Sequence, residues 1–196
     1  MPFAAVASAA VPIKLRDCDR HGPGSGAELF VVEGDSASQS VAQLRDARYQ
    51  AVLPMQGKPL NAWKASERKV AANPFFMALV AAIGADWGRF CRLEALRYER
   101  LLLLMDPDAD GIHCGALVTM FVYRWMRPVL DAGRVEIVRP PLDEIIAVRR
   151  RGLASIKSEE LAATCIAPAT RRTRRLTAAD AQAAVDVFSP GNSRSR

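Results

Sequence analysis

The sequence predicts an α/β fold in which helices flank a parallel β-sheet, followed by a small, mostly helical C-terminal tail. Short apolar runs bounded by turn residues alternate with segments of helical periodicity, and this alternation is typical of parallel sheets. The chain has 196 residues, half of them hydrophobic. This length suits one domain, or one domain with a small appendage, around a sizeable core.

Apolar runs predict four strands, at residues 28–32, 50–55, 101–105 and 134–138. Helical signals predict five helices, at residues 36–47, 73–83, 111–132, 158–165 and 177–188. Ser36 is the expected N-cap of the first helix. Asn73 and Pro74 are typical of an N-cap and first helical residue, and Gly84 and Gly133 are typical of helix ends.

Turn residues and composition divide the chain into three predicted parts. Residues 1–27 are a lead-in segment or linker, because they end in a stretch rich in Gly and Pro. Residues 28–145 form the main domain, and residues 146–196 form the tail. The last residues, from 189 on, are rich in Ser and Arg and are expected to be disordered.

The net charge of +6 and the pI near 9.5 favour a polyanionic partner such as nucleic acid, although an ordinary basic soluble protein fits equally well. No apolar run is long enough to span a bilayer, so no membrane partner is expected. The scattered cysteines indicate the reducing cytoplasm, and the lack of a C-x-x-C pair argues against a structural zinc site. Arginines cluster at Arg149, Arg150 and Arg151, and again at Arg171, Arg172, Arg174 and Arg175.

Acidic residues follow two of the predicted strands. Glu33 ends the first strand, and Asp106, Asp108 and Asp110 follow the third. Ligands gather at the carboxyl ends of parallel strands, and carboxylates that meet there repel one another unless a cation lies between them. Oxygen ligands suit Mg²⁺, so the sequence predicts a magnesium site at these acids.

The acidic triplet has two other interpretations. An EF-hand calcium loop is rejected, because its twelfth position would be Leu117, where a bidentate Glu is needed. A solvated acidic turn that caps the following helix remains an alternative.

Several motifs together resemble one protein family. Residues 28–37 (ELFVVEGDSA), 51–65 (AVLPMQGKPLNAWKA), 96–113 (LRYERLLLLMDPDADGIH) and 138–142 (VRPPL) are similar, in order and spacing, to the TOPRIM region of DNA gyrase and topoisomerase IV B subunits. KLRDC (14–18) resembles the family's lead-in, and residues 151–188 resemble the end of the same subunit. The chain is thus identified as the C-terminal TOPRIM half of a type IIA DNA topoisomerase B subunit.

The resemblance implies a TOPRIM, Rossmann-like fold and a set of roles. Glu33, Asp106 and Asp108 match the family's metal-binding acids, with Asp110 completing the triplet, and Glu33 could also act as general acid and base. The implied DNA-binding residues are Lys58, Arg45, Arg48, His113, Arg171 and Arg172. Arg45 and Arg48 fit a solvated helix face equally well, and His113 fits local packing.

The implied function is Mg²⁺-dependent support of DNA double-strand cleavage and religation. Type IIA enzymes cut DNA with a tyrosine of the A subunit, and none of Tyr49, Tyr98 and Tyr123 lies in a matching motif. The expected partners are therefore double-stranded DNA and an A subunit, with a separate ATPase-transducer subunit as a further candidate. Without them the chain is expected to be inactive.

Departures from the family pattern keep other functions open. Ser38 and Gln39 stand where the family has glycines, and Pro107 separates two of the acids. A non-catalytic DNA-binding or regulatory paralogue of the topoisomerase is the main alternative. A nuclease that acts alone is a third.

Overall fold

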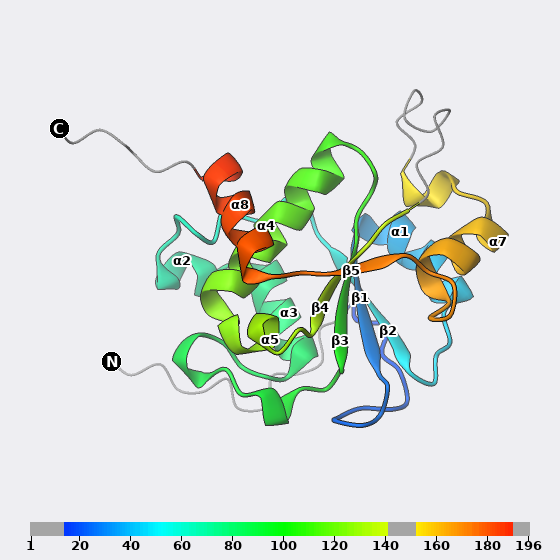
Figure 1. The fold of residues 1–196 in the computed structure, drawn as a ribbon, viewed down its shortest axis with the longest axis horizontal. Helices are drawn as coiled ribbons and strands as arrows, with labels where there is room; N and C mark the ends of the chain where they lie inside the picture. The colour runs from blue at the N-terminus through cyan, green and yellow to red at the C-terminus, as the bar shows by residue number, and fades with distance from the viewer. Residues whose placement is uncertain (1–13, 141–151, 190–196) are drawn as a thin grey trace.

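The computed structural model describes residues 14–140 and 152–189, which form one five-stranded sheet of order β2-β1-β3-β4-β5 (Figure 1). The strands are β1 (Glu28–Glu33), β2 (Gln50–Met55), β3 (Arg100–Leu104), β4 (Val135–Val138) and β5 (Thr173–Arg175). β1 to β4 pair in parallel, and β5 pairs antiparallel with β4. The predicted mostly parallel α/β fold is confirmed.

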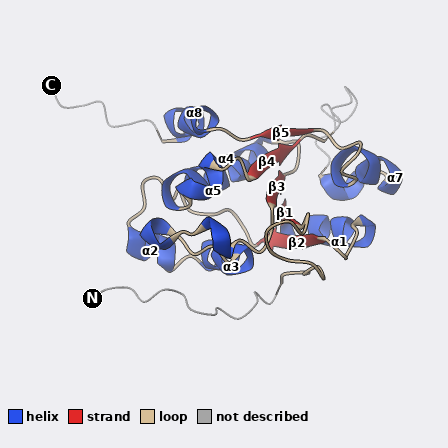
Figure 2. Ribbon diagram, turned by 60° about the horizontal axis from the view of Figure 1, so that its bottom comes forward, coloured by secondary structure: helices blue, strands red, loops and turns tan. Residues whose placement is uncertain are grey.

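Helices cover both faces of the sheet (Figure 2). The helices are α1 (Gly34–Leu44), α2 (Glu67–Ala71), α3 (Pro74–Ile83), α4 (Ala109–Trp125), α5 (Arg127–Asp131), α7 (Ser158–Leu161) and α8 (Ala178–Phe188). Short helical turns lie at Gly88–Phe90, Leu93–Ala95, Leu153–Ser155 and Ala162–Ile166. α1 and α7 lie on one side of the sheet, and α2 to α5 lie on the other. Among the described residues, no helix is long and apolar enough to cross a membrane.

Alternate side chains along the strands pack into two separate hydrophobic cores, one on each face of the sheet. Leu29 and Leu103 point into the core that contains Phe76 of α3. Phe30 belongs to the other core, which also contains Leu161 of the tail. Because side chains alternate across a strand, this pattern explains why the strands are apolar on both faces. It also shows that the tail packs on the same sheet as the main domain.

Local signals predict several boundaries correctly. The side chain of Asn73 accepts a hydrogen bond from the Phe76 amide at 3.0 Å, and Gly84 is left-handed at φ 77°, as expected for the two ends of α3. The long helix predicted for residues 111–132 is instead two helices that meet at Met126. Pro128 lies in the first turn of α5, where its missing N–H breaks the continuous hydrogen-bond pattern.

Three features differ from the sequence-based expectation. α1 begins after Glu33 rather than Ser36, and it ends at Leu44. β5 is absent from the predicted strands, since three exposed residues carry no apolar pattern. Ser189, where the sequence predicts the start of the disordered end, is instead buried, and its hydroxyl accepts a hydrogen bond from Asn61. The cluster Arg149–Arg151, the domain boundary at residue 145 and the tail end from residue 190 lie outside the described residues.

Candidate functional site

Glu33 lies where β1 turns into α1, at the carboxyl edge of the sheet. The turn depends on Gly34, whose φ of 75° is disfavoured for residues with a side chain. Glu33 Oε1 accepts a hydrogen bond from Cys114 Sγ at 3.8 Å. Glu33 Oε2 is buried and has no hydrogen-bond partner among the described residues. A buried carboxylate oxygen without a partner is uncommon and suggests that a ligand completes it.

Asp106 follows β3, which is the neighbour of β1 in the sheet. Its Oδ1 accepts a hydrogen bond from the Leu153 amide at 2.8 Å, so the tail directly contacts the acidic loop, residues 105–108 between β3 and α4. Gly152 also approaches the Asp106 carboxylate closely. A Cβ added at position 152 would lie 2.7 Å from Asp106 Oδ2. A side chain at position 152 would therefore collide with the Asp106 carboxylate.

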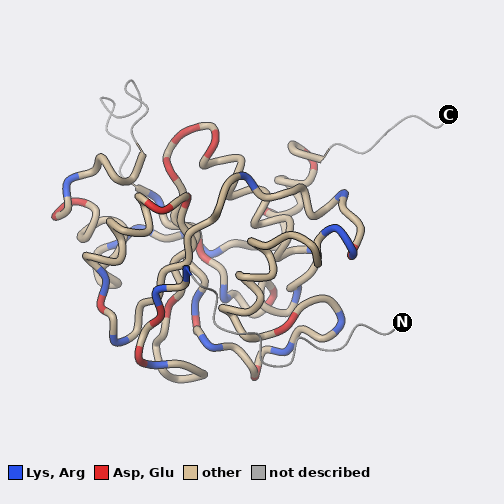
Figure 3. The backbone as a smooth tube through the Cα atoms, turned by 180° about the vertical axis from the view of Figure 1, so that it is seen from behind, with Lys and Arg blue, Asp and Glu red and all other residues tan. Residues whose placement is uncertain are grey.

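Asp108 and Asp110 lie at the start of α4. Asp108 caps the helix, and its side chain accepts a hydrogen bond from the Gly111 amide at 2.8 Å. Asp110 is exposed and forms a 3.0 Å ion pair with Lys58 from the loop after β2. Asp108 therefore caps α4, as the alternative interpretation of the triplet expected, and the acids also lie near one another at this edge of the sheet. Figure 3 shows Asp and Glu in red along the backbone, including a red stretch in a loop at the top of that view.

The acids perturb one another electrostatically. The pKa of Glu33 is raised, first by burial and then by the charges of Asp106 and Asp108. Burial also raises the pKa of Asp106, with a further contribution from Asp108. Both shifts mean that the ionised carboxylates are destabilised in the protein alone, and a bound cation would reverse this effect. The four acids do not, however, bring three ligand oxygens within 4.8 Å of one another in the described structure.

The predicted DNA-binding residues differ in their surroundings. Lys58 and Arg48 are exposed, although each is paired, Lys58 with Asp110 and Arg48 with Asp46. Arg172 is exposed as well. His113 stacks on Phe188 of α8, with ring centroids 5.0 Å apart. This contact matches the local packing that the sequence left open for His113 as an alternative to DNA binding.

Two of the arginines predicted to bind DNA make contacts inside the protein. The side chain of Arg171 is buried. Its guanidinium forms an ion pair with the Glu28 carboxylate, and the two side chains are only 2% and 4% exposed. It cannot reach a DNA phosphate without breaking this pair. Arg45 is half-buried and donates from its guanidinium to the carbonyl of Gln50, so it is engaged inside the protein too.

Two contacts to the proposed metal-binding acids were not predicted from the sequence. One is the thiol of Cys114 on Glu33, and the other is the Leu153 amide on Asp106. Both join residues far apart in the chain, and no spacing rule in the sequence reveals them.

Comparison with known proteins identifies the family. Residues 28–140 match the Toprim domain model. The DNA gyrase B subunit of Haloferax lucentense is 37% identical over 212 residues, covering 94% of this chain and 33% of the relative. That of Thermus thermophilus is 37% identical over 209 residues, covering 91% of the chain and 33% of the relative. The novobiocin-sensitive gyrase B subunit of Streptomyces niveus is 44% identical over 138 residues, covering 70% of the chain and 20% of the relative.

The chain thus spans a third or less of the length of these relatives. The matched segment of the chain contains the whole acidic site, and the similarity continues through the tail. The chain therefore belongs to the Toprim domain family, and its resemblance to the Toprim region of type IIA DNA topoisomerase B subunits is confirmed.

Proposed function

We propose that this chain is the Mg²⁺-binding component of a type IIA DNA topoisomerase. It would support cleavage and religation of double-stranded DNA together with a subunit that carries the nucleophilic tyrosine. One observation carries this proposal. Glu33 Oε2 is buried and has no hydrogen-bond partner among the described residues, and the carboxylates of Asp106 and Asp108 lie near it at the carboxyl edge of the sheet. The similarity to gyrase B subunits supports the class of reaction.

The donor chemistry suits a magnesium ion, and the carboxylates would have to move closer together to hold it. Glu33, Asp106 and Asp108 would hold it, and Asp110 with its partner Lys58 would lie at the rim. All of the donors are carboxylate oxygens, which are the ligands that Mg²⁺ prefers. When bound, the ion would stabilise negative charge on the scissile phosphate and on the leaving 3′ oxygen.

Glu33 would also transfer a proton. In the metal-free protein, burial and the neighbouring acids raise its pKa, so its carboxyl group holds a proton at a higher pH than an exposed Glu does, whereas a bound cation would lower that pKa. A carboxyl group of this kind can donate to the 3′ oxygen during cleavage and accept the proton again during religation.

DNA would contact the exposed cations near this edge and on the tail. Lys58, Arg48 and Arg172 remain candidates, whereas Arg171 and Arg45 are engaged inside the protein. The net charge of +6 favours binding to the phosphate backbone. An ATPase-transducer subunit would be a further partner, and the cytoplasm is the expected compartment.

A second function is favoured by the contacts of the aspartates. Asp106, Asp108 and Asp110 each already have a partner within the protein. Ser38, in place of a family glycine, is buried in α1. These features suit a non-catalytic DNA-binding or regulatory paralogue in which the acidic loop has a structural role.

The decisive experiment is formation of a covalent cleavage complex. The chain is mixed with the gyrase A subunit of the same genome, plasmid DNA and Mg²⁺, and protein-linked DNA is measured for three forms of the chain. Wild type and Glu67→Gln, an exposed control on α2, should form complexes, whereas Glu33→Gln should form at least about 100-fold fewer. Salt-sensitive DNA binding without any cleavage complex would favour the non-catalytic function.

A further inference from the structure

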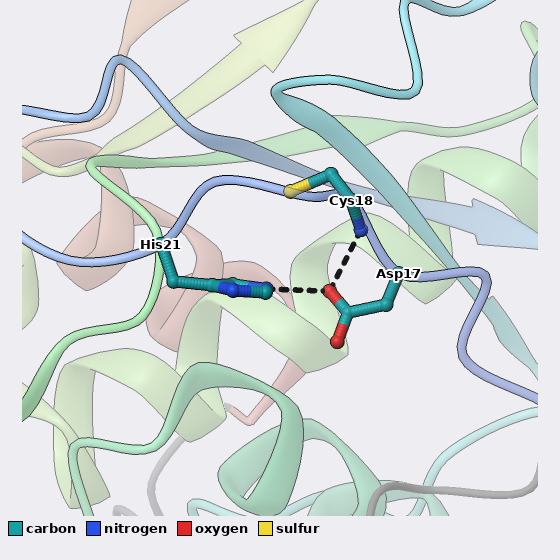
Figure 4. Close-up of side chains that lie close together, drawn as sticks. All are labelled: Asp17, Cys18 and His21. Carbon is teal, nitrogen blue, oxygen red and sulfur yellow. Dashed lines mark hydrogen bonds and ion pairs between the residues drawn. The ribbon is translucent and has the colours of Figure 1, made fainter.

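A second cluster of potential metal ligands lies in the lead-in segment. Asp17, Cys18 and His21 bring a carboxylate oxygen, a thiol sulfur and a ring nitrogen within 4.8 Å of one another (Figure 4). Their spacing, Asp-Cys-x-x-His, contains no C-x-x-C pair, which is why the sequence predicts no zinc site. The three side chains come together because the chain turns back on itself at residues 17–22.

The fold fixes this turn at the amino-terminal end of the strands. The amide of Gly22 donates to the carbonyl of Arg97 at 2.9 Å, and the amide of Asp19 donates to the carbonyl of Ala47 at 3.1 Å. Arg97 lies just before β3, whereas Glu33 and the acidic loop lie at the carboxyl ends of the strands. The cluster is therefore separate from the candidate magnesium site.

Asp17 is held ionised and oriented by its neighbours. Its Oδ1 accepts a hydrogen bond from the Tyr98 hydroxyl at 2.6 Å, and its Oδ2 accepts one from Arg97. Burial acts to raise the pKa of Asp17, but hydrogen bonds from Tyr98, His21 and Arg97 outweigh it and hold the pKa well below its usual range. Hydrogen bonds of this kind orient the ligands of metal sites and are costly to remove.

We propose that Asp17, Cys18 and His21 form a binding site for a thiophilic divalent cation of the zinc class, with one position open to water. Carboxylate, thiolate and imidazole are all Zn²⁺ ligands, and a tetrahedral Zn²⁺ site places such donor atoms about 3.3–3.8 Å apart. His21 Nε2 and Asp17 Oδ1 are 2.8 Å apart, so each side chain would move by less than about 1 Å to admit the ion.

Access and selectivity follow from the burial of the three side chains. Asp17 and His21 are 28% and 32% exposed, and this opening connects the cluster to solvent. Cys18 is buried and closes the inner side. Mg²⁺ disfavours thiolate ligands, so the cluster should select against the ion proposed for the acidic site.

The positively charged guanidinium of Arg97 already contacts the cluster. Arg97 Nη2 lies 3.0 Å from His21 Nε2 and also pairs with Asp17. A bound metal would displace Arg97 from His21 and leave its bond to Asp17 Oδ2 as an outer contact. The ion would then cross-link residues 17–21 within the lead-in segment, which stays joined to Arg97 through Asp17 and through the amide of Gly22.

Cobalt spectroscopy tests the site directly. Co²⁺ in a tetrahedral site absorbs in the visible range, and a thiolate ligand adds a charge-transfer band. The wild-type chain should show both signals when Co²⁺ occupies this cluster, and Zn²⁺ but not excess Mg²⁺ should remove them. His21→Ala, a change at a partly exposed side chain, should weaken Co²⁺ binding at least about tenfold.

Two control variants separate this site from other cysteines and from the acidic loop. Cys91→Ser and Asp108→Asn should both keep the wild-type cobalt spectrum, since neither residue belongs to the cluster. The Asp108→Asn control also makes the outcome independent of the magnesium proposal. A spectrum without a thiolate band, or equal Co²⁺ affinity in wild type and His21→Ala, would overturn the assignment and leave the cluster as an ion pair only.

Discussion

Gly111 allows α4 to begin against the backbone of the acidic loop. A Cβ added at this position would lie 2.1 Å from the carbonyl oxygen of Asp106 and 2.8 Å from its amide nitrogen. Both atoms belong to the backbone, so no side-chain rotation can relieve the collision. Gly111→Ala must therefore push the start of α4 away from Asp106 by about 1.4 Å, since non-bonded heavy atoms prefer separations of about 3.5 Å.

The size of the effect follows from two opposing terms. Overpacking of this severity costs about 3 kcal/mol, the upper end of the usual range. Alanine gains back about 1 kcal/mol through its higher helix propensity. We expect Gly111→Ala to lower the free energy of unfolding by about 2 kcal/mol.

Gly115, one turn further along α4, provides the matched control. A Cβ there meets only the Met105 side chain, at an ordinary 3.4 Å. Gly115→Ala should therefore raise the free energy of unfolding by up to about 1 kcal/mol.

Urea unfolding followed by circular dichroism measures both variants, and calorimetry measures their Mg²⁺ affinity. Gly111→Ala should also bind Mg²⁺ more weakly than Gly115→Ala, because Asp106 and Asp108 move with the loop. Equal stability of the two variants would show that the close approach at Gly111 has been misjudged.

Three further predictions concern the tail. Arg171→Met should lower the free energy of unfolding by about 3 kcal/mol, because buried Glu28 then keeps only the hydrogen bond from Gln50 and the longer ion pair with Arg100, whereas the exposed neighbour Arg172→Met should change it little in urea titrations. Thr177→Ala should cost about 1 kcal/mol in the same assay, since the Thr177 side chain and Asp180 form the capping box of α8. The hydrogen bond from Thr177 is the main cause that lowers the pKa of Asp180 to about 2. This stabilisation is present above the ordinary Asp pKa near 4 and is lost as the pH falls toward 2, so an acid titration of wild type, but not of Asp180→Asn, should show it.

The parts of the fold that the sequence predicts are those encoded locally. The continuous apolar run before Met105 predicts a strand buried on both faces, and Asn73 and Gly84 predict the two ends of α3. β5 cannot be predicted in this way. Its residues, Thr173–Arg175, are exposed and form a strand only because the edge of β4 offers them backbone partners.

The arginines show the same limit at the level of the site. Arg171 and Arg172 are adjacent and chemically identical, so composition predicts the same DNA-binding role for both. In the structure one is buried against Glu28 and the other is exposed. Glu28 lies 143 positions earlier in the chain, and only the packing of the tail on the sheet reveals the pair. A run of basic residues therefore predicts charge but not accessibility.

The tail contacts the sheet at both ends of its strands. Arg171 binds Glu28 at the amino end of β1, and the Leu153 amide binds Asp106 just after the carboxyl end of β3. Just after Arg171, β5 extends the sheet along the edge of β4. The division of the chain at residue 145 remains a prediction, but these contacts mean that the position of Asp106 depends on residues of the tail. Because Asp106 is a proposed metal ligand, changes in the tail should alter metal affinity without touching any ligand.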